Sequence, residues 1–424
     1  MNSQLPDLIE ITQTYPASVR LDFRSLVAEQ FESLGPRNKI SPGMRIAVGV
    51  GSRGIANLKE IVEATVRVLI DAGARPFVIP AMGSHGGATP DGQIKVLAGY
   101  GITAESLGVP IEAGMDVEKI GTALDGWDVL WSVPALKADG IVAINRVKPH
   151  TDFRGSLGSG IQKMLTIGFG KHAGAANAHR AAAHFGHEIA IREFARIILD
   201  KVPVLCGIAL LEDQHHQTAA IEVLPPDAIV RQEPVLLERA RALMPRLPLD
   251  EIDLLIIDRI GKEISGTGMD TNIIGRDILG YSTALQHAGP VTPHISRIFV
   301  RDLSAATKGN GIGIGLADFT TSRAVKALDL RSIYINAITA IGMHPAKIPI
   351  YFDSDRESID AALTTLATTH PEKTRIVRIA DTLSLERMLV SECCAEMLEK
   401  LPGVRITGQA RAMQFDPGGN LLPF

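Results

Sequence analysis

The sequence predicts an α/β protein of two domains with mostly parallel sheets. The chain has 424 residues, more than a single hydrophobic core usually organises, so two domains are expected. Short apolar segments alternate with amphipathic segments of helical period, a pattern typical of parallel strands joined by covering helices. This series stops and restarts near Pro248, where we place the boundary between a domain of residues 1–248 and a domain of residues 249–424.

The first domain opens with an extended arm and a helix over residues 22–34. Residues 45–51, RIAVGVG, are almost wholly apolar, as expected of a strand that is buried on both faces. In residues 56–74 the apolar positions recur with helical period and end at a glycine, which predicts an amphipathic helix. The same reasoning predicts strands at 75–82, within 129–147 and at 202–211, and helices at 89–101 and 230–248.

The second domain begins with the apolar strand 253–261, DLLIIDRIG, and repeats the alternation. Period and composition predict further strands at 297–303 and 374–380, and helices within 320–330, 334–342, 356–369 and 384–400. The tail, residues 404–424, is compatible with a last strand in either domain.

Composition excludes several classes of protein. The net charge is −4, and aromatic residues make up 4% of the chain, which argues against nucleic acid as a partner. No run of about 18 uncharged apolar residues occurs, so we expect no membrane partner and a cytoplasmic protein. The chain has 3 cysteines and no C-x-x-C pair, so neither a thiolate metal site nor a disulfide scaffold is expected.

Residues 49–54, GVGSRG, form a glycine-rich turn between a strand and a helix. The spacing is that of a dinucleotide-binding loop, but the next strand ends in Pro80, Ala81 and Met82 rather than in the acid that holds a ribose. Arg53 at the start of a helix instead suits a phosphate or a carboxylate. A plain strand–helix turn is the alternative interpretation.

Residues 83–89, GSHGGAT, follow the next predicted strand. Glycines on both sides of His85 allow close approach of a ligand at the carboxyl edge of a parallel sheet, where ligands of α/β proteins bind. We therefore interpret His85 as a functional residue, with a structural histidine as the alternative.

Residues 145–180, NRVKPHTDFRGSLGSGIQKMLTIGFGKHAGAANAHR, place His150, Lys163 and His179 in a glycine-rich setting. Such a setting suits a flat or phosphorylated cofactor, which a lysine can hold by charge or by a covalent bond. A neutral imidazole can ligate a metal, and another can act as a general base. His184 and His187 have the spacing of a metal-binding pair on one helix, but we interpret them as structural or surface residues.

Residues 261–276, GKEISGTGMDTNIIGR, open the second domain directly after its first strand. Lys262 and Asn272 in this segment are candidates to face a ligand. Pairing of Glu263 with Arg276 is the structural alternative.

These motifs together resemble the nickel-pincer-nucleotide-dependent lactate racemase family. The resemblance rests on GSHGGAT, a Pro-His pair, the S-G-x-x-K loop and a later Asn-x-His, and it covers roughly residues 45–190. It implies two α/β domains with a cofactor cleft between them. The implied cofactor is a nicotinate-derived mononucleotide whose sulfur-bearing arms hold nickel, and it is supplied by cofactor-biosynthesis proteins as partners.

The resemblance also implies roles for individual residues. His85 and His150 correspond to the catalytic acid/base pair on opposite faces of the substrate, and His179 corresponds to the nickel ligand. Lys163 corresponds to the lysine that anchors the nucleotide, covalently in some members.

Further cofactor contacts are implied at Arg53 and its neighbour Ser52, with Lys262 and Asn272 as candidates in the second domain. Val50 replaces an acidic residue of the family's lactate enzymes, and the interval from His150 to Lys163 is a few residues longer than in those enzymes.

The resulting hypothesis is a racemase or epimerase that inverts carbon 2 of a 2-hydroxy acid by proton-coupled hydride transfer to the nickel-pincer nucleotide. The substrate is either a lactate-like acid or a sugar acid. Two alternatives stand beside it: an NAD-dependent 2-hydroxy-acid dehydrogenase that uses GVGSRG, and a non-catalytic nucleotide- or anion-binding protein.

Overall fold

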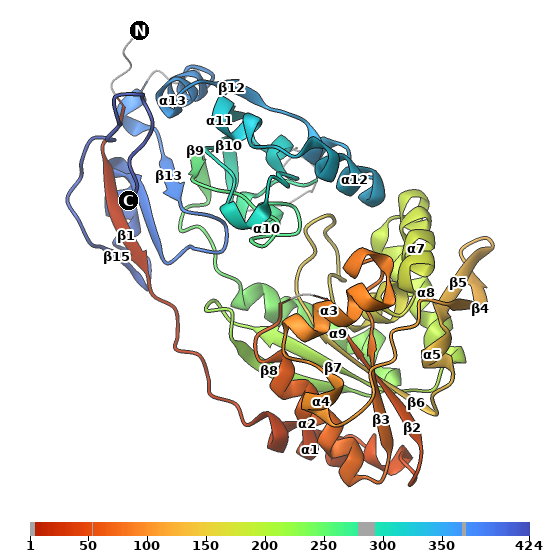
Figure 1. The fold of residues 1–424 in the computed structure, drawn as a ribbon. Coiled ribbons are helices and arrows are strands. Elements are labelled where there is room, and N and C mark those ends of the chain that lie inside the picture. Colours follow the sequence, from red (N-terminus) through yellow and green to blue (C-terminus); the bar gives the residue numbers. More distant parts are fainter. Residues whose placement is uncertain (1–4, 53, 279–292, 367–369) are drawn as a thin grey trace. The chain divides into compact units, whose positions relative to one another are not determined.

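The computed structural model describes residues 5–52, 54–278, 293–366 and 370–424, and it confirms the predicted α/β class with mostly parallel sheets (Figure 1). The chain divides into two compact units. The first unit is Ala17–Met244, and the second unit combines Met1–Pro16 with Pro245–Phe424. The break after Met244 lies close to the predicted boundary at Pro248, but the N-terminal arm belongs to the second unit and not to the first.

The arm is placed there by strand pairing. Strand β1 (Leu8–Gln13) runs antiparallel between β14 (Arg387–Ser391) and β15 (Val404–Ile406), both of which lie in the second unit. Leu8, Ile9 and Ile11 of this strand are buried. No local sequence pattern marks this pairing, because the partner strands lie more than three hundred residues away along the chain.

The first unit is built on a five-stranded sheet of order β3-β2-β6-β7-β8. The first four strands are parallel, and β8 runs antiparallel to β7. The strands are β2 (Arg45–Val50), β3 (Arg75–Pro80), β6 (Gly140–Arg146), β7 (Val204–Glu212) and β8 (Thr218–Leu224).

Helices cover both faces of this sheet. In β2, Ile46, Val48 and Val50 join a core with residues of α1 (Phe23–Ser33) and α2 (Leu58–Asp71). Ala47 points the other way, into a core with residues of α7 (Lys171–Phe185), α8 (His187–Lys201) and α9 (Pro226–Leu243). This alternation explains why the buried strands are apolar at every position. The remaining helices of this unit are short or peripheral: α3 (Pro90–Gly99), α4 (Ala104–Leu107), α5 (Val133–Leu136) and α6 (Ile161–Lys163).

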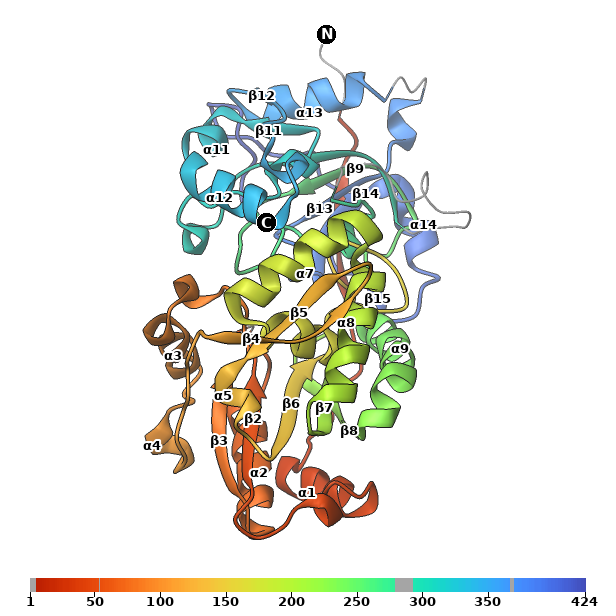
Figure 2. The same ribbon diagram turned by 90° about the vertical axis from the view of Figure 1, so that its right-hand side faces the viewer.

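A two-stranded hairpin, β4 (Val117–Ala123) and β5 (Trp127–Ser132), packs against α7 and α8 (Figure 2). Trp131 is fully buried, and its indole N–H donates to the Leu165 carbonyl oxygen at 2.8 Å. Its ring stacks on Phe169 with centroids 4.7 Å apart. The hairpin therefore fixes the segment between α6, which ends at Lys163, and α7, which carries His179.

The second unit contains an eight-stranded sheet of order β12-β11-β10-β9-β13-β14-β1-β15. Its first five strands are parallel and the last three antiparallel. The parallel strands are β9 (Glu251–Ile257), β10 (His294–Val300), β11 (Phe319–Thr321), β12 (Ile350–Phe352) and β13 (Ile376–Ile379). Its helices are α10 (Thr271–Ile274), α11 (Ser322–Lys326), α12 (Leu330–Ala340), α13 (Asp355–Thr364) and α14 (Ala395–Leu398).

The predicted helix over residues 384–400 is wrong in its first half. Arg387–Ser391 forms β14, in which Met388 and Val390 are buried while Arg387 is exposed. Pairing with β1 on one side and β13 on the other satisfies the backbone of this segment. Hydrogen bonding to two flanking strands thus determines the conformation of this segment, although its local sequence favours a helix.

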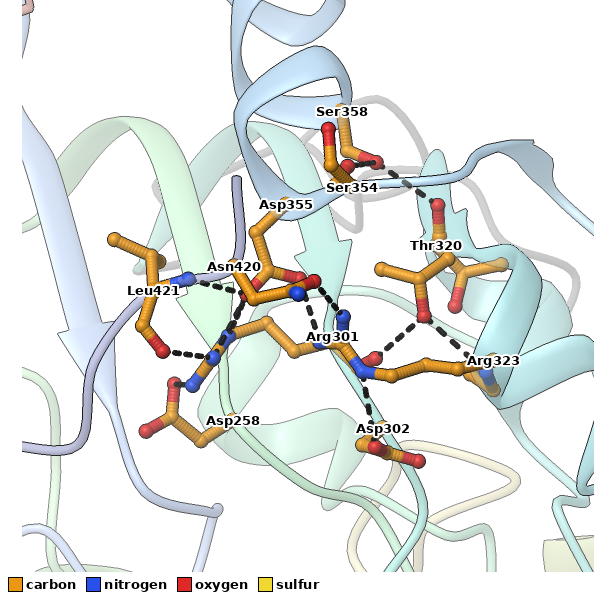
Figure 3. A network of polar contacts seen from close by, with 12 residues as sticks. Asp258, Arg301, Asp302, Thr320, Arg323, Ser354, Asp355, Ser358, Asn420 and Leu421 are labelled. Carbon is orange, nitrogen blue, oxygen red and sulfur yellow. Dashed lines mark hydrogen bonds and ion pairs between the residues drawn. The ribbon is translucent and has the colours of Figure 1, made fainter. Parts of the chain in front are cut away.

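Polar contacts attach the C-terminal tail to the second unit (Figure 3). The buried carboxylate of Asp355 accepts from Arg301, Arg323 and the Leu421 backbone N–H, at 2.7, 2.6 and 2.9 Å. Arg301 also donates to the Leu421 carbonyl oxygen at 2.6 Å. Together with the pairing of β15, this network assigns the tail to the second unit.

In the described part of the chain, no helix combines the length and the apolar character that crossing a membrane requires.

Candidate active site

A closed loop after β6 brings His150 next to Lys163, although 13 positions separate them in the sequence. Lys148 and Ser159 exchange two backbone hydrogen bonds of 3.0 and 2.9 Å, which join the two ends of this loop. At the end of β6, the Asn145 side-chain amide donates to the Gly160 carbonyl oxygen at 2.7 Å. The longer interval between His150 and Lys163 is therefore accommodated inside a closed loop and does not separate the two side chains.

The Nζ atom of Lys163 contacts the Nε2 atom of His150. The other ring nitrogen of His150, Nδ1, accepts the backbone N–H of Asp152 at 3.0 Å. A neutral imidazole carries one proton, so an accepting Nδ1 places that proton on Nε2, facing the lysine amine. His150 and Lys163 are thus placed to share a proton, as an acid/base group must.

His179 lies on α7 beside Lys163 and His187. Its ring makes an edge contact with His187, with centroids 6.2 Å apart. Burial is the main cause that lowers the pKa of His179 to about 4. At neutral pH the imidazole is therefore uncharged and has a lone pair for a metal ion.

His187 belongs to this cluster, which the sequence analysis did not foresee. The rings of His150, Phe153 and His187 form a stack with successive centroids 4.6 and 5.0 Å apart. Burial is the main cause that lowers the pKa of His187. The spacing of the histidines gave no signal for this stack, because it depends on the return of the loop that carries Phe153.

The predicted placement of His184 and His187 on one helix is wrong. Gly186, with φ of 86°, separates α7 from α8, and His187 is the first residue of α8. His184 packs instead against Trp127, with ring centroids 5.6 Å apart. His184 is therefore structural, as expected, whereas His187 is part of the candidate site.

His85 follows β3 in a loop whose backbone requires glycine. Gly83, Gly86 and Gly87 have φ values of 57°, 65° and 66°, which side chains other than glycine rarely adopt. The Nδ1 atom of His85 lies 2.8 Å from the Met82 carbonyl oxygen. A carbonyl only accepts, so Nδ1 carries the proton and Nε2 has the lone pair of a general base.

The glycine-rich loop before Lys163 is closely packed against neighbouring side chains and backbone. A Cβ atom at Gly155 would overlap the Glu188 carboxylate, one at Gly158 would overlap the Lys148 carbonyl, and one at Gly160 would overlap the Glu233 carboxylate. These glycines allow close packing within the protein. Close packing alone therefore accounts for glycine at these three positions.

The structure describes contacts at three of the remaining predicted residues. Ser52 follows β2, and its carbonyl oxygen accepts from the Tyr100 hydroxyl. Arg53 lies outside the described residues. Lys262 and Asn272 are in the second unit, where Lys262 donates to the Asn336 side chain at 2.9 Å and Asn272 binds the Asp270 carboxylate at 2.9 Å.

The cluster offers one neutral imidazole to a metal rather than a complete ligand set. Among the described residues, no three His, Cys, Asp or Glu side chains converge as they would in a metal site made by protein alone. A metal whose other ligands come from an organic cofactor needs only a single neutral nitrogen donor from the protein. The donor set is therefore compatible with the implied nickel-pincer nucleotide.

The sequence matches no protein-family model and no curated protein. Solved structures are more informative. A lactate racemase apoprotein from Thermoanaerobacterium thermosaccharolyticum is similar over 89% of this chain and 99% of that chain, with 13% identity and a TM-score of 0.53. A protein from Thermotoga maritima is similar over 76% of this chain and 80% of that chain, with 13% identity and a TM-score of 0.46, which is too weak to assign a fold.

The first of these likenesses shows the class of fold. The chain has a lactate racemase-like, two-domain α/β fold.

Proposed function

We propose that this protein is a racemase or epimerase that inverts carbon 2 of a 2-hydroxy acid with the help of a nickel-pincer nucleotide. The observation that carries the proposal is the cluster of His150, Lys163 and His179 in a lactate racemase-like fold. A small lactate-like acid and a sugar acid are both compatible with it.

The proposed cofactor sites follow from the chemistry of the side chains. His179, held neutral by burial, is the nickel ligand, and Lys163 is the group that holds the nucleotide by charge or by a covalent bond. When bound, the cofactor supplies a reversible hydride acceptor, a task that no amino-acid side chain performs. Ser52, Arg53, Lys262 and Asn272 remain proposed cofactor contacts.

His85 and His150 are the proposed acid/base residues. The hydrogen at carbon 2 leaves as hydride more easily when the neighbouring hydroxyl loses its proton in the same step. The Nε2 lone pair of His85 can accept the hydroxyl proton of one enantiomer. The proton between His150 and Lys163 can then be donated to the same oxygen when the other enantiomer forms. Two such groups are needed because the two enantiomers present opposite faces.

The geometry favours this proposal over the two alternatives. A dehydrogenase that binds NAD in the GVGSRG loop needs an acid at the end of β3, and Pro80, Ala81 and Met82 stand there. A purely binding protein gives no reason for a lysine amine held against an imidazole nitrogen.

Chiral analysis of products tests the reaction. The protein, produced together with cofactor-making enzymes, is incubated with single enantiomers of 2-hydroxy acids in deuterated water. We expect the opposite enantiomer to appear with its carbon-bound hydrogen retained, because hydride returns to the same carbon. Reduction of added NAD would support the dehydrogenase instead, and binding without inversion across the panel would support the non-catalytic alternative.

A further inference from the structure

Lys171 is a buried lysine whose amine contacts only neutral oxygen atoms. Its side chain is fully buried, and Nζ donates to the Pro80 carbonyl oxygen at 2.7 Å and to the Gln93 side-chain oxygen at 3.2 Å. Within the described residues no carboxylate pairs with it, and burial lowers its pKa to about 8. An unpaired buried charge is unfavourable, so the fold must gain something from this lysine.

The backbone of Lys171 is also constrained. Its φ of 53° is left-handed, a conformation that non-glycine residues adopt mainly where surrounding contacts enforce it. Lys171 begins α7, directly after the π-helical turn Met164–Gly168 that follows Lys163. The constrained lysine therefore belongs to the segment that carries Lys163 and His179.

The partner of Lys171 leads to His85. Gln93, on α3, is fully buried, and its side-chain N–H₂ donates to the Gly83 carbonyl oxygen at 2.9 Å and to the His85 carbonyl oxygen at 3.3 Å. One amide thus binds Lys171 through its oxygen and the loop of His85 through its nitrogen.

Close packing supports this connection. A Cβ atom at Gly92, next to Gln93, would overlap the Gly86 carbonyl oxygen, so α3 lies directly against the His85 loop. The Gly83 backbone N–H also donates to the Gly168 carbonyl oxygen at 3.2 Å. The His85 loop is therefore fixed both by α3 and by the turn that precedes α7.

We propose that Gln93 and Lys171 are positioning residues that hold His85 in register with the segment carrying Lys163 and His179. Gln93 orients the backbone on both sides of Ser84, and Lys171 orients Gln93. The correct placement of the His85 ring against a substrate then depends on two buried side chains that contact neither substrate nor cofactor. The effect of this positioning on catalysis rests on the proposed function. The positioning itself rests only on the hydrogen bonds of Gln93 and Lys171.

The variant Gln93→Glu separates positioning from simple structural support. It keeps the oxygen that Lys171 binds, and the new carboxylate pairs with the lysine charge. It replaces the N–H₂ group by an oxygen that faces two carbonyl oxygens. If Gln93 has a purely structural role, the variant should be at least as stable as the wild type, and the placement of the His85 ring should not change. A positioning role predicts a stable protein with a displaced His85.

Two signals report on His85 in the protein without cofactor. Imidazole ¹⁵N spectra, assigned by the signal that disappears in His85→Gln, give the tautomer. We expect the wild type to carry the proton on Nδ1 and Gln93→Glu to lose this preference. Exchange of the His85 and Ala88 amide hydrogens should become roughly tenfold faster, the factor expected when hydrogen bonds of ordinary net strength are lost.

Matched variants complete the experiment. Gln30 makes the same kind of contacts at a remote place, with its side chain bound to the Ile221 carbonyl oxygen at 2.8 Å and the Val223 N–H at 2.7 Å. Gln30→Glu should leave both His85 signals unchanged. If Gln93→Glu does not fold, Gln93→Met, which keeps shape and removes the contacts, takes its place.

The inference is overturned if His85 shows the wild-type tautomer and exchange in the Gln93 variant. In protein loaded with cofactor, a positioning role further predicts a lower kcat at unchanged nickel content. The His85 signals could change in the Gln93 variant while the wild-type protein never binds nickel. That result would support the positioning role and refute the proposed function, so failure of one is distinguishable from failure of the other.

Discussion

At the scale of single residues, the chemistry of the site depends on protons held by local contacts. His85 and His150 have opposite tautomers because a carbonyl oxygen faces Nδ1 of the first and a backbone N–H faces Nδ1 of the second. One histidine therefore presents a lone pair on Nε2 and the other a proton. This complementary pair is what an acid/base mechanism requires in either direction.

Replacement of His150 tests this assignment. His150→Gln should reduce kcat by roughly a hundredfold to ten-thousandfold, the usual contribution of a general acid or base. Nickel content should remain at the wild-type level, because the proposed metal ligand is His179. Metal analysis and chiral assay of the same preparation check both points. Normal turnover in this variant would refute the acid/base role of His150.

Glu233 provides a prediction about pH. Its side chain is buried on α9, and one carboxylate oxygen accepts the Gln162 backbone N–H at 2.9 Å, beside Lys163. Burial raises the pKa of Glu233 to about 7. The folded protein then binds this proton more tightly than the unfolded chain does, so the free energy of unfolding falls as pH rises from about 4 to about 7, by at most about 3 kcal/mol.

Glu233→Gln should remove this fall, because the glutamine carries no charge at any pH. Relative to the wild type, the variant should gain stability between about pH 5 and about pH 8, as measured by urea unfolding of the first unit. Glu238→Gln on the same helix, where the carboxylate is exposed, is the control. Parallel pH profiles for wild type and Glu233→Gln would contradict the raised pKa.

At the scale of elements, the break between α7 and α8 determines which histidine serves the site. Sequence spacing placed His184 and His187 together, but Gly186 separates them and turns His187 toward Phe153 and His179. Neighbours of a metal ligand typically influence affinity by orienting it.

His187→Gln should therefore weaken nickel retention by roughly tenfold to a hundredfold, the usual effect of removing such a neighbour. His184→Gln changes the same residue type three positions away, at the contact with Trp127, and should leave nickel retention unchanged. Dialysis against a chelator followed by metal analysis compares the two. Equal loss of nickel from both variants would exclude His187 from the site.

The same scale shows what the sequence can and cannot predict. His85, His150, Lys163 and His179 could be proposed from the sequence because they lie in or beside glycine-rich segments. Gln93 and Glu233 were not found, because they lie in ordinary helical sequence, and Lys171 was not singled out within its glycine-rich segment. All three gain their roles from contacts with other elements. The helix predicted over residues 384–400 failed for a related reason, since β14 exists only between β13 and β1.

At the scale of the whole molecule, the second unit is assembled from both ends of the chain. The arm supplies β1, and the tail supplies β15 and the contacts of Leu421 with Asp355 and Arg301. The alternation of strands and helices predicted the parallel sheets of both units. It could not predict these additions, because no local pattern marks a strand that is completed by a distant partner.

The buried carboxylate of Asp355 is the centre of the tail contacts, and its loss should be costly. Asp355→Asn keeps the volume but leaves Arg301 and Arg323 without their shared negative partner, so we expect a loss of about 3 kcal/mol or more in the stability of the second unit. Asp360→Asn, which removes a partly exposed ion pair with Arg356, should cost about 1 kcal/mol or less. Thermal unfolding of both variants measures the difference. Equal effects would show that the tail network contributes little.

The proposed function requires that Lys163 and His179 hold a nickel-bearing nucleotide. Native mass spectrometry tests it most directly, applied to protein produced together with the cofactor-making enzymes and compared with a lactate racemase produced in the same way. We predict added mass of a nucleotide with nickel on the wild type, its loss in Lys163→Met, and its retention in Lys119→Met, which alters an exposed lysine of the β4–β5 hairpin. Wild-type protein without added mass, beside a fully loaded lactate racemase, would contradict the claim.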